Sequence, residues 1–275
     1  MTAASGGVHP LDEATRIEWL GPGHGRGATH PAYGNMVGPF GGTTMAVLLR
    51  AVIEHPDRRG VPFALTVNYC AAVKEGAFEL RSRLARDGRS VQHWTMELVQ
   101  EGEIAATASA VTGSERETFS HQTLEAPKVP PAGEVAEAEP SFRVAWLSAY
   151  DMRFFEGSPV FDAPEGTPIG SARTGMWIAD RPARPLDHVS LAAISDAFIV
   201  RLFHLRGHPA RAGTVSITTY FYATEADLAA QGTRPLLAIA DARVFRHGFH
   251  DQVGELWSAD GALLAVTTQT VWYKE

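Results

Sequence analysis

Residues 187–205 read DHVSLAAISDAFIVRLFHL, and drawn as a helix this stretch is apolar on almost every side. A helix of that kind has to be covered by other parts of the protein on most of its faces. Asp187, just before the apolar residues, has the side chain expected of an N-cap. We therefore predict a buried central helix over residues 187–205 with a sheet wrapped around it.

Asp196 is the one acid inside this apolar stretch. Its helical neighbours three and four residues away, at 192, 193, 199 and 200, are all apolar. A weak polar stripe would face water, and Asp196 lies about 120° around the helix from it. The stripe consists of Ser190, Arg201, His204 and His208. Burying a carboxylate without partners costs several kcal/mol. Asp196 is therefore a candidate site residue, with a purely structural buried acid as the alternative.

The order of elements around this helix is repeated in the first half of the chain. There, Gly41-Gly42 leads into a second apolar helical run that ends near residue 53. Strand-like runs follow at 63–73, 78–85, 90–100 and 104–111. In the second half, strand patterns lie at 171–179 before the helix and at 214–223, 236–245, 251–257 and 262–272 after it. The predicted hairpins LVQEGEIAAT (98–107) and LWSADGALLA (256–265) also echo each other, which favours an internal duplication.

A curved antiparallel sheet around one long helix, the hotdog arrangement, covers an apolar helix on most sides. Two fused copies predict an α+β double hotdog. The expected domains are an N-terminal hotdog at 1–113 with an irregular first segment, a polar, Pro-rich linker at 114–145, and a C-terminal hotdog at 146–275. Two unrelated α+β domains would account for the strands but not for the echo.

The composition argues against several classes of protein. A formal net charge of −7 argues against general affinity for nucleic acids or anionic membranes. No apolar stretch reaches the length of about 18 residues that a membrane span needs. The first residues lack the basic and apolar regions of a signal peptide, and the single Cys70 fits a reducing compartment. We expect a cytoplasmic protein.

Familiar catalytic motifs are missing from the sequence. It contains neither a Gly-x-Ser-x-Gly nucleophile elbow nor a Gly-Lys-Ser/Thr phosphate loop. His247 and His250 lie in a predicted hairpin connection, where a turn is favoured over a metal site. Cys70 falls in a predicted strand and is expected to be a packed thiol. We expect neither a metal nor a bound cofactor.

Gly41 and Gly42 are candidate residues for substrate binding and for an oxyanion hole. Small residues at a helix start leave backbone N–H groups exposed, and such groups can polarise a carbonyl or stabilise an oxyanion. Close packing of the helix against its neighbours would explain the two glycines equally well.

Several segments resemble the acyl-CoA thioesterase II family of double-hotdog enzymes. They are GNMVGPFGGTTMAVLLRA (34–51), LTVNYCAAV (65–73), DGRSVQHWTMELVQEGEIAATASA (87–110), RPLDHVSLAAISDAF (184–198), TVSITTYFYA (214–223) and GELWSADGALLAVTTQ (254–269). The resemblance implies hydrolysis of acyl-CoA by an Asp, a Thr or Ser, and a Gln gathered around one water. Carried over by motif, these residues are Asp196, Thr214 and Gln269.

The chemistry of these three side chains is coherent in itself. Asp196 can take a proton from water, and Thr214 and Gln269 can orient both the water and the acid. Simple strand alternation places Thr214 on the face of Ser216, opposite Ile217 and away from the helix. We therefore expect Thr214 to reach Asp196 only if the strand carries a bulge.

The sequence predicts a hydrolase of lipid metabolism, an acyl-CoA thioesterase that needs no metal and could associate into a homodimer. One active site per chain is expected, because the first helix has no acid between residues 40 and 49 and Ala110 aligns with Gln269. One alternative is hydration or dehydration of an enoyl or hydroxyacyl thioester. That chemistry would want a histidine beside the acid, and His188 is about 12 Å away along a helix. Another alternative is a catalytically silent acyl-thioester-binding protein.

Overall fold

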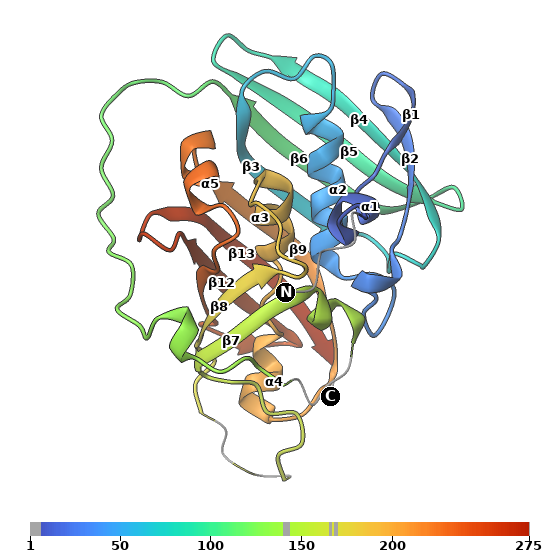
Figure 1. Ribbon diagram of the computed structural model, residues 1–275. Coiled ribbons are helices and arrows are strands. Elements are labelled where there is room, and N and C mark those ends of the chain that lie inside the picture. Colours follow the sequence, from blue (N-terminus) through green and yellow to red (C-terminus); the bar gives the residue numbers. More distant parts are fainter. Residues whose placement is uncertain (1–6, 140–143, 165–166, 168–169, 275) are drawn as a thin grey trace.

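The computed structural model describes residues 7–139, 144–164, 167 and 170–274, and its strands form one long curved sheet (Figure 1). Every described strand pair is antiparallel. The strand order is β1-β2-β4-β5-β6-β3-β9-β13-β12-β10-β8-β7, and β11 pairs with β12 off this path. The two halves of this order mirror each other, and each half wraps its own helical segment. The protein is a double hotdog of the α+β class, as the sequence predicts.

The strands of the two halves correspond one to one apart from the extra β11, α3 and α4 together take the place of α2, and two short helices have no counterpart. The first half contains β1 (Glu18–Gly21), β2 (His24–Ala28), α2 (Gly41–Ile53), β3 (Val61–Tyr69), β4 (Ala77–Asp87), β5 (Val91–Gln100) and β6 (Glu103–Gly113). The second contains β7 (Tyr150–Glu156), β8 (Thr174–Asp180), α3 (His188–Ile194), α4 (Arg201–Arg206), β9 (Arg211–Phe221), β10 (Leu236–Asp241), β11 (Phe245–Arg246), β12 (Phe249–Trp257) and β13 (Leu263–Lys274). The short helices are α1 (Pro10–Ala14) and α5 (Glu225–Gln231).

The two halves meet where β3 pairs with β9. Thr66 and Thr218 lie directly opposite each other there, with their Oγ1 atoms 2.9 Å apart. Thr66 also pairs with Ser109 of β6, and Thr218 pairs with Thr268 of β13. Because corresponding pairs lie on both sides, Thr66 and Thr218 are equivalent positions. The register then relates residues of β3 and β6 to residues of β9 and β13.

The prediction of one continuous central helix over residues 187–205 is wrong, because the helix is interrupted. Helix α3 ends at Ile194, a turn follows, and α4 begins at Arg201. The Arg201 side chain donates to the C=O of Ile199, the group that a continuous helix would pair with the N–H of Phe203. The N–H of Phe203 bonds the C=O of Val200 instead. No described helix is long and apolar enough to cross a membrane.

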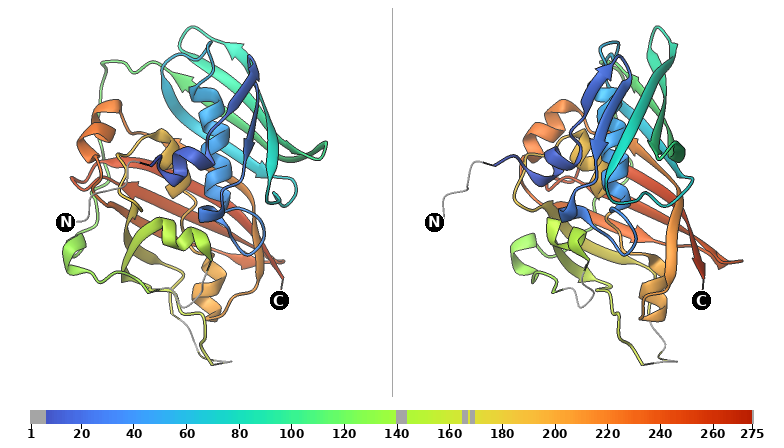
Figure 2. Two further views of the ribbon diagram at one scale, coloured as in Figure 1. Left: turned by 45° about the vertical axis from the view of Figure 1, so that its right-hand side comes forward. Right: turned by 90° about the vertical axis from the view of Figure 1, so that its right-hand side faces the viewer.

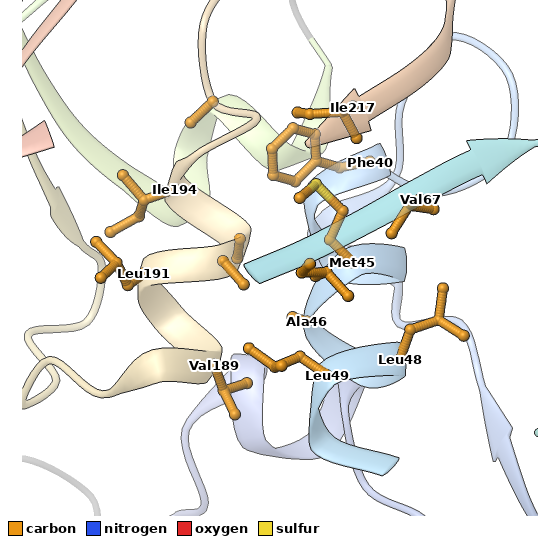
Figure 3. Close-up of a cluster of buried hydrophobic side chains, with 14 of the residues drawn as sticks. Phe40, Met45, Ala46, Leu48, Leu49, Val67, Val189, Leu191, Ile194 and Ile217 are labelled. Atoms are coloured by element: carbon orange, nitrogen blue, oxygen red, sulfur yellow. The ribbon is translucent and has the colours of Figure 1, made fainter. Parts of the chain in front are cut away.

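Helices α2 and α3 pack against each other inside the curved sheet (Figures 1 and 2). Figure 3 shows Leu49 of α2 close to Val189 of α3, and Met45 and Ile194 belong to the same buried cluster. A Cβ on Gly42 would collide with a backbone carbonyl of α3, so the first turn of α2 can touch α3 only because that residue is glycine. This contact fixes the start of α2 against the end of α3.

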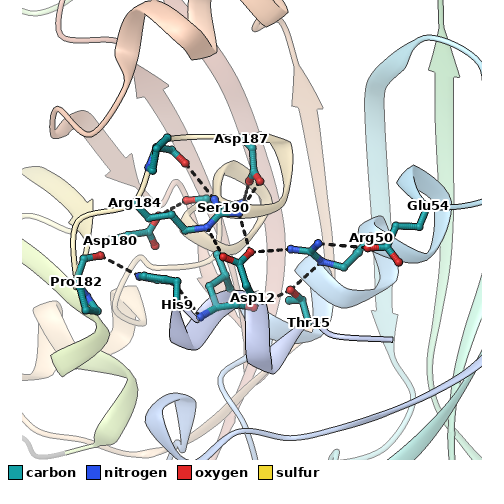
Figure 4. Close-up of polar contacts among 12 residues, drawn as sticks. His9, Asp12, Thr15, Arg50, Glu54, Asp180, Pro182, Arg184, Asp187 and Ser190 are labelled. Carbon is teal, nitrogen blue, oxygen red and sulfur yellow. Dashed lines mark hydrogen bonds and ion pairs between the residues drawn. The ribbon is translucent and has the colours of Figure 1, made fainter. Parts of the chain in front are cut away.

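At the opposite end of the two helices, α1 is held by a polar network (Figure 4). Asp12 accepts from Arg50 at 3.1 Å and from Arg184 at 2.9 Å. Arg184 also donates to Asp187, which caps α3 by accepting from the N–H of Ser190. The network ties α1 to the last turn of α2 and to the first turn of α3, and so covers this end.

The segment predicted as a linker packs on the outer face of the second half of the sheet. Gln122 bonds the backbone of Gly261 and Leu263, and the indole N–H of Trp177 donates to the C=O of Pro130 at 2.9 Å. Ala126 and Val129 pack beside buried Trp257. Residues 140–143 of the predicted 114–145 linker lie outside the described residues, and the predicted domain boundaries stay predictions.

Candidate active site

Strand β9 carries the bulge that Thr214 needs to face the helices. Ser216 pairs with Thr270 and Thr214 pairs with Val271, so Val215 is an extra residue on β9. Val215 is exposed and Ile217 is fully buried, which fits a change of face between them. The bulge turns Thr214 inward, where its hydroxyl donates to Oε1 of Gln269 at 2.9 Å.

Asp196 lies in the turn just after α3 and is only 9% exposed. The side chain of Gln269 and the backbone N–H of Gly42 lie beside its carboxylate and stabilise its charged form as donors. Since Oε1 of Gln269 already accepts from Thr214, the NH2 group of the same amide is the donor to the carboxylate. The structure thus joins the three residues in one chain, from Thr214 through Gln269 to Asp196.

The carboxyl group of Asp196 is electrostatically unusual. Burial is the largest influence and raises its pKa, and the two hydrogen bonds, from Gln269 and then from Gly42, oppose the shift. The resulting pKa is about 7. An acid with this pKa exchanges protons near neutral pH, as a general base has to do.

The raised pKa makes a prediction about stability. Between pH ~4, where the unfolded side chain ionises, and pH ~7, folded Asp196 keeps a proton that the unfolded chain loses. Raising the pH across this window therefore costs the wild type a few kcal/mol, on the order of the pKa shift. In thermal melts, we expect the Tm of Asp196→Asn minus the Tm of the wild type to become more positive from about pH 5 to about pH 8. A difference that does not change with pH would contradict the raised pKa.

The two glycines at the start of α2 lie against the acid but do different things. The N–H of Gly42 bonds Asp196, so it orients the carboxylate. A Cβ on Gly41 would lie 2.6 Å from Oδ2 of Asp196, which leaves no room for a larger residue. No hydrogen bond from the Gly41 N–H to any described residue is found, and this group stays a candidate oxyanion donor.

Tyr69 belongs to the site and carries no motif that would reveal it in the sequence. Its hydroxyl donates to the C=O of Gly41 at 2.8 Å. Burial, and then the negative charge of Asp196, raise the pKa of Tyr69 well above its ordinary value. The phenol therefore stays protonated and holds the first turn of α2 in place.

A cavity of about 1170 Å³ opens beside these groups. Asp196 is the only carboxylate among the described residues that line it, and Thr214, Gln269, Gly41 and Tyr69 lie in the same wall. Much of the remaining lining is apolar and includes Phe40, Trp146, Leu147, Phe161, Phe198 and Phe203. Phe40 and Trp146 stack with ring centroids 4.4 Å apart. The cavity suits an apolar ligand that ends at the buried acid.

Cys70 corrects one sequence expectation. It follows the last residue of β3, is exposed, and lines the cavity, so it is not a packed thiol. Its Sγ lies 3.8 Å from the C=O of Asn68.

Basic side chains also line the cavity, although the protein as a whole is acidic. Arg206, Arg211 and Lys274 are among the lining residues, together with His208. Arg211 and Lys274 are exposed and lie directly opposite each other on β9 and β13. Like charges in that arrangement repel, and neither forms an ion pair with another described residue. This pair is suited to an anionic ligand.

The first half lacks the matching side chains. With Thr66 equivalent to Thr218, Leu65 is equivalent to Ile217. Ala110 pairs with Leu65 as Gln269 pairs with Ile217, so Ala110 is the counterpart of Gln269. Strand β3 has its own bulge at Phe63, equivalent to Val215, so Pro62 takes the place of Thr214. A proline and an alanine offer no side-chain hydrogen bond there.

The polar stripe predicted to face water is buried, which is a second correction. Ser190, Arg201 and His204 are each no more than 4% exposed, and His208 is partly buried. Ser190 donates to Asp180 of β8, and Arg201 donates to Thr174 of β8 and Gln252 of β12, so the sheet covers this side of α3 and α4 as well. Asp196 is nevertheless buried as predicted, because it faces the start of α2.

His247 and Gly248 form the turn between β11 and β12, where His247 has a φ of 55°, and His250 lies in β12. Among the described residues, no three His, Cys, Asp or Glu side chains are grouped as metal ligands would be.

Comparisons with known proteins concern the family and the fold of the chain. The model of the acyl-CoA thioesterase N-terminal domain matches residues 30–113, and that of the C-terminal domain matches residues 125–273. A hotdog-fold protein of unknown function from Alicyclobacillus acidocaldarius is 42% identical, with 98% of this chain and 99% of that chain covered and a TM-score of 0.91. The acyl-CoA thioesterase II TesB2 from Mycobacterium marinum is 20% identical, with 96% and 98% covered and a TM-score of 0.74. No curated protein matches the chain.

Proposed function

The chain belongs to the acyl-CoA thioesterase family, and on that premise we propose that it hydrolyses acyl-CoA to a carboxylic acid and coenzyme A. The observation that carries the proposal is the hydrogen-bonded chain of Thr214, Gln269 and Asp196 in the wall of an apolar cavity. A buried acid with a pKa of about 7 in such a place is a general base.

In the proposed reaction, Asp196 takes one proton from a water molecule as the water oxygen attacks the thioester carbonyl carbon. Gln269 and Thr214 orient the acid and the water. The Gly41 N–H donates to the oxygen that becomes negative in the tetrahedral intermediate. When the intermediate collapses, the C–S bond breaks and the proton on Asp196 passes to the sulfur. The products are the free acid and the coenzyme A thiol, and the enzyme returns to its starting state.

The two ends of an acyl-CoA match the two kinds of lining. The apolar side chains, such as Phe198 and Phe203, would bury the acyl chain, and hydrophobic transfer favours that burial. The phosphates of coenzyme A would meet Arg211 and Lys274. Because Pro62 and Ala110 replace two of the three proposed catalytic residues in the first half, we propose one active site per chain.

We expect replacement of both Arg211 and Lys274 by alanine to raise KM for acyl-CoA about fivefold, because two exposed charges facing phosphates are lost. The KM for an acyl-pantetheine thioester without the nucleotide should not change. Steady-state kinetics with both substrates check this, and Arg83→Ala, an exposed arginine of β4, is the control. An equal rise in KM for both substrates would contradict a phosphate contact.

The hydratase alternative has no support in the geometry. His188 begins α3, at the far end of that helix from Asp196, and its ring packs on Phe221. Among the described residues, no histidine side chain is hydrogen-bonded or ion-paired with Asp196.

A panel of acyl-CoAs of increasing chain length, assayed for thiol release, tests the proposed function. We expect release of coenzyme A with some chain lengths, and mass analysis should find the free acid. Products heavier than the substrate by one water, with the thioester intact, would indicate hydration. Failure to cleave any member of the panel would overturn the proposal. Cytoplasmic location, a role in lipid metabolism and homodimer formation remain predictions from the sequence.

A further inference from the structure

Arg201 is a fully charged side chain buried in the second half of the molecule. It is 1% exposed, and burial lowers its pKa to about 9, so it remains protonated at neutral pH. Its guanidinium donates to the C=O of Ile199, the C=O of Ala172, the hydroxyl of Thr174 and the side chain of Gln252. No carboxylate of a described residue forms an ion pair with it. The acceptors of its hydrogen bonds are all neutral oxygens, and the negative charge of Asp241 acts on it without a direct contact.

The bond to Gln252 fixes the orientation of that amide. Nε of Arg201 can only donate, so the group facing it at 3.1 Å is Oε1 of Gln252. The NH2 end of the amide therefore faces away from Arg201. This nitrogen is buried and has no hydrogen-bond partner among the described residues, and Gln252 as a whole is 1% exposed. A buried donor without an acceptor is uncommon and costly in a native structure.

Gln252 lies beside the proposed catalytic residues. It pairs directly with Gln269 across β12 and β13, so the two side chains are neighbours on the inner face of the sheet. Gln252 lines the same cavity as Asp196 and Gln269. It lies on the side of Gln269 away from β9 and Thr214, toward the strands that lead to β8 and β7.

We propose that the NH2 group of Gln252 binds an oxygen on the acyl group of the substrate, a hydroxyl or keto oxygen close to the thioester. The inference rests on the proposed thioesterase function and adds the acyl class to it. The apolar residues of the loop after α3, Phe198 and Ile199, line the cavity as well, so an oxygen placed there has few other donors. The positively charged Arg201 donates to Oε1 of Gln252. This bond polarises the amide and strengthens its NH2 group as a donor.

The test compares pairs of acyl-CoAs of equal chain length, one saturated and one with a hydroxyl on the third carbon. The readout is the ratio of kcat/KM for the hydroxylated substrate to kcat/KM for the plain one. We expect this ratio to fall about tenfold in Gln252→Leu, which has no donor. Gln252→Glu also lacks the NH2 group but keeps an oxygen for Arg201, so it should show the same fall with the fold intact in a thermal melt. Gln231→Leu, a buried glutamine of α5, should leave the ratio as in wild type.

An unchanged ratio in both Gln252 variants, with plain acyl-CoA still cleaved by the wild type, would overturn this inference and leave the proposed function standing. An equal fall for both members of each pair leaves the ratio unchanged and would place the contact on the shared thioester or pantetheine part instead. Failure of the wild type to cleave any plain acyl-CoA would overturn both proposals.

Discussion

Asp196→Asn should lower kcat by about 10²- to 10⁴-fold, the usual contribution of a general base. Asparagine keeps the size of the side chain and an acceptor for Gln269 and Gly42, but it cannot take a proton from water. Initial rates of thiol release at saturating acyl-CoA measure the effect. The expected loss therefore reports the proton transfer rather than a change of shape.

The matched control is Asp180→Asn. Asp180 is another buried aspartate with a raised pKa, and it accepts a hydrogen bond from Ser190 (Figure 4). It does not line the cavity. We expect near wild-type kcat for the folded Asp180→Asn protein. Equal losses in the two variants, or full activity of Asp196→Asn, would contradict the assignment of Asp196 as the base.

Gly41→Ala should lower kcat/KM by about 10²-fold or more. The new Cβ would lie 2.6 Å from Oδ2 of Asp196 and 3.0 Å from the hydroxyl of Tyr69, so the acid or the first turn of α2 has to move. A displacement of about 1 Å in a catalytic group is enough for a loss of this size. Steady-state kinetics alongside a thermal melt separate the loss of activity from unfolding.

The control for Gly41→Ala is Gly21→Ala at the end of β1, where a Cβ would meet nothing within 4 Å. We expect this variant to keep the activity and the Tm of the wild type. If Gly41→Ala were as active as Gly21→Ala, the first turn of α2 would not be part of the site.

The duplicated pattern could be predicted from the sequence because it depends on interactions between residues that are close in the chain. Alternating strands, the hairpins around Gly102 and Gly261, and two apolar helices are set by neighbouring residues, and they predict the double hotdog. Strands β1, β2 and β7 were missed. The segment HGRGA of β2 has no alternation of apolar and polar residues, because glycines at 25 and 27 leave room for Ile17 and Phe78 between the edge strand β1 and β4.

The candidate site could be predicted only in part from the sequence, because its geometry depends on contacts between residues that are far apart in the chain. Asp196 stands out by its apolar neighbours, and Thr214 and Gln269 were found through family motifs. The bulge at Val215 could be stated only as a requirement, since register is set between β9 and β13. The break after Ile194 depends on Arg201, whose acceptors on β8 and β12 are distant in sequence. Tyr69 reaches Gly41 only in the folded chain.

A single turnover in ¹⁸O-labelled water tests the central claim most directly. The enzyme is mixed in excess with an acyl-CoA that it cleaves, so that each enzyme molecule turns over at most once. The mass of the released acid is then measured by mass spectrometry. If Asp196 directs water onto the thioester, every acid molecule carries one ¹⁸O atom from that first cycle. Unlabelled acid, with ¹⁸O in the peptide that contains Asp196, would show attack by the carboxylate itself and would contradict the account.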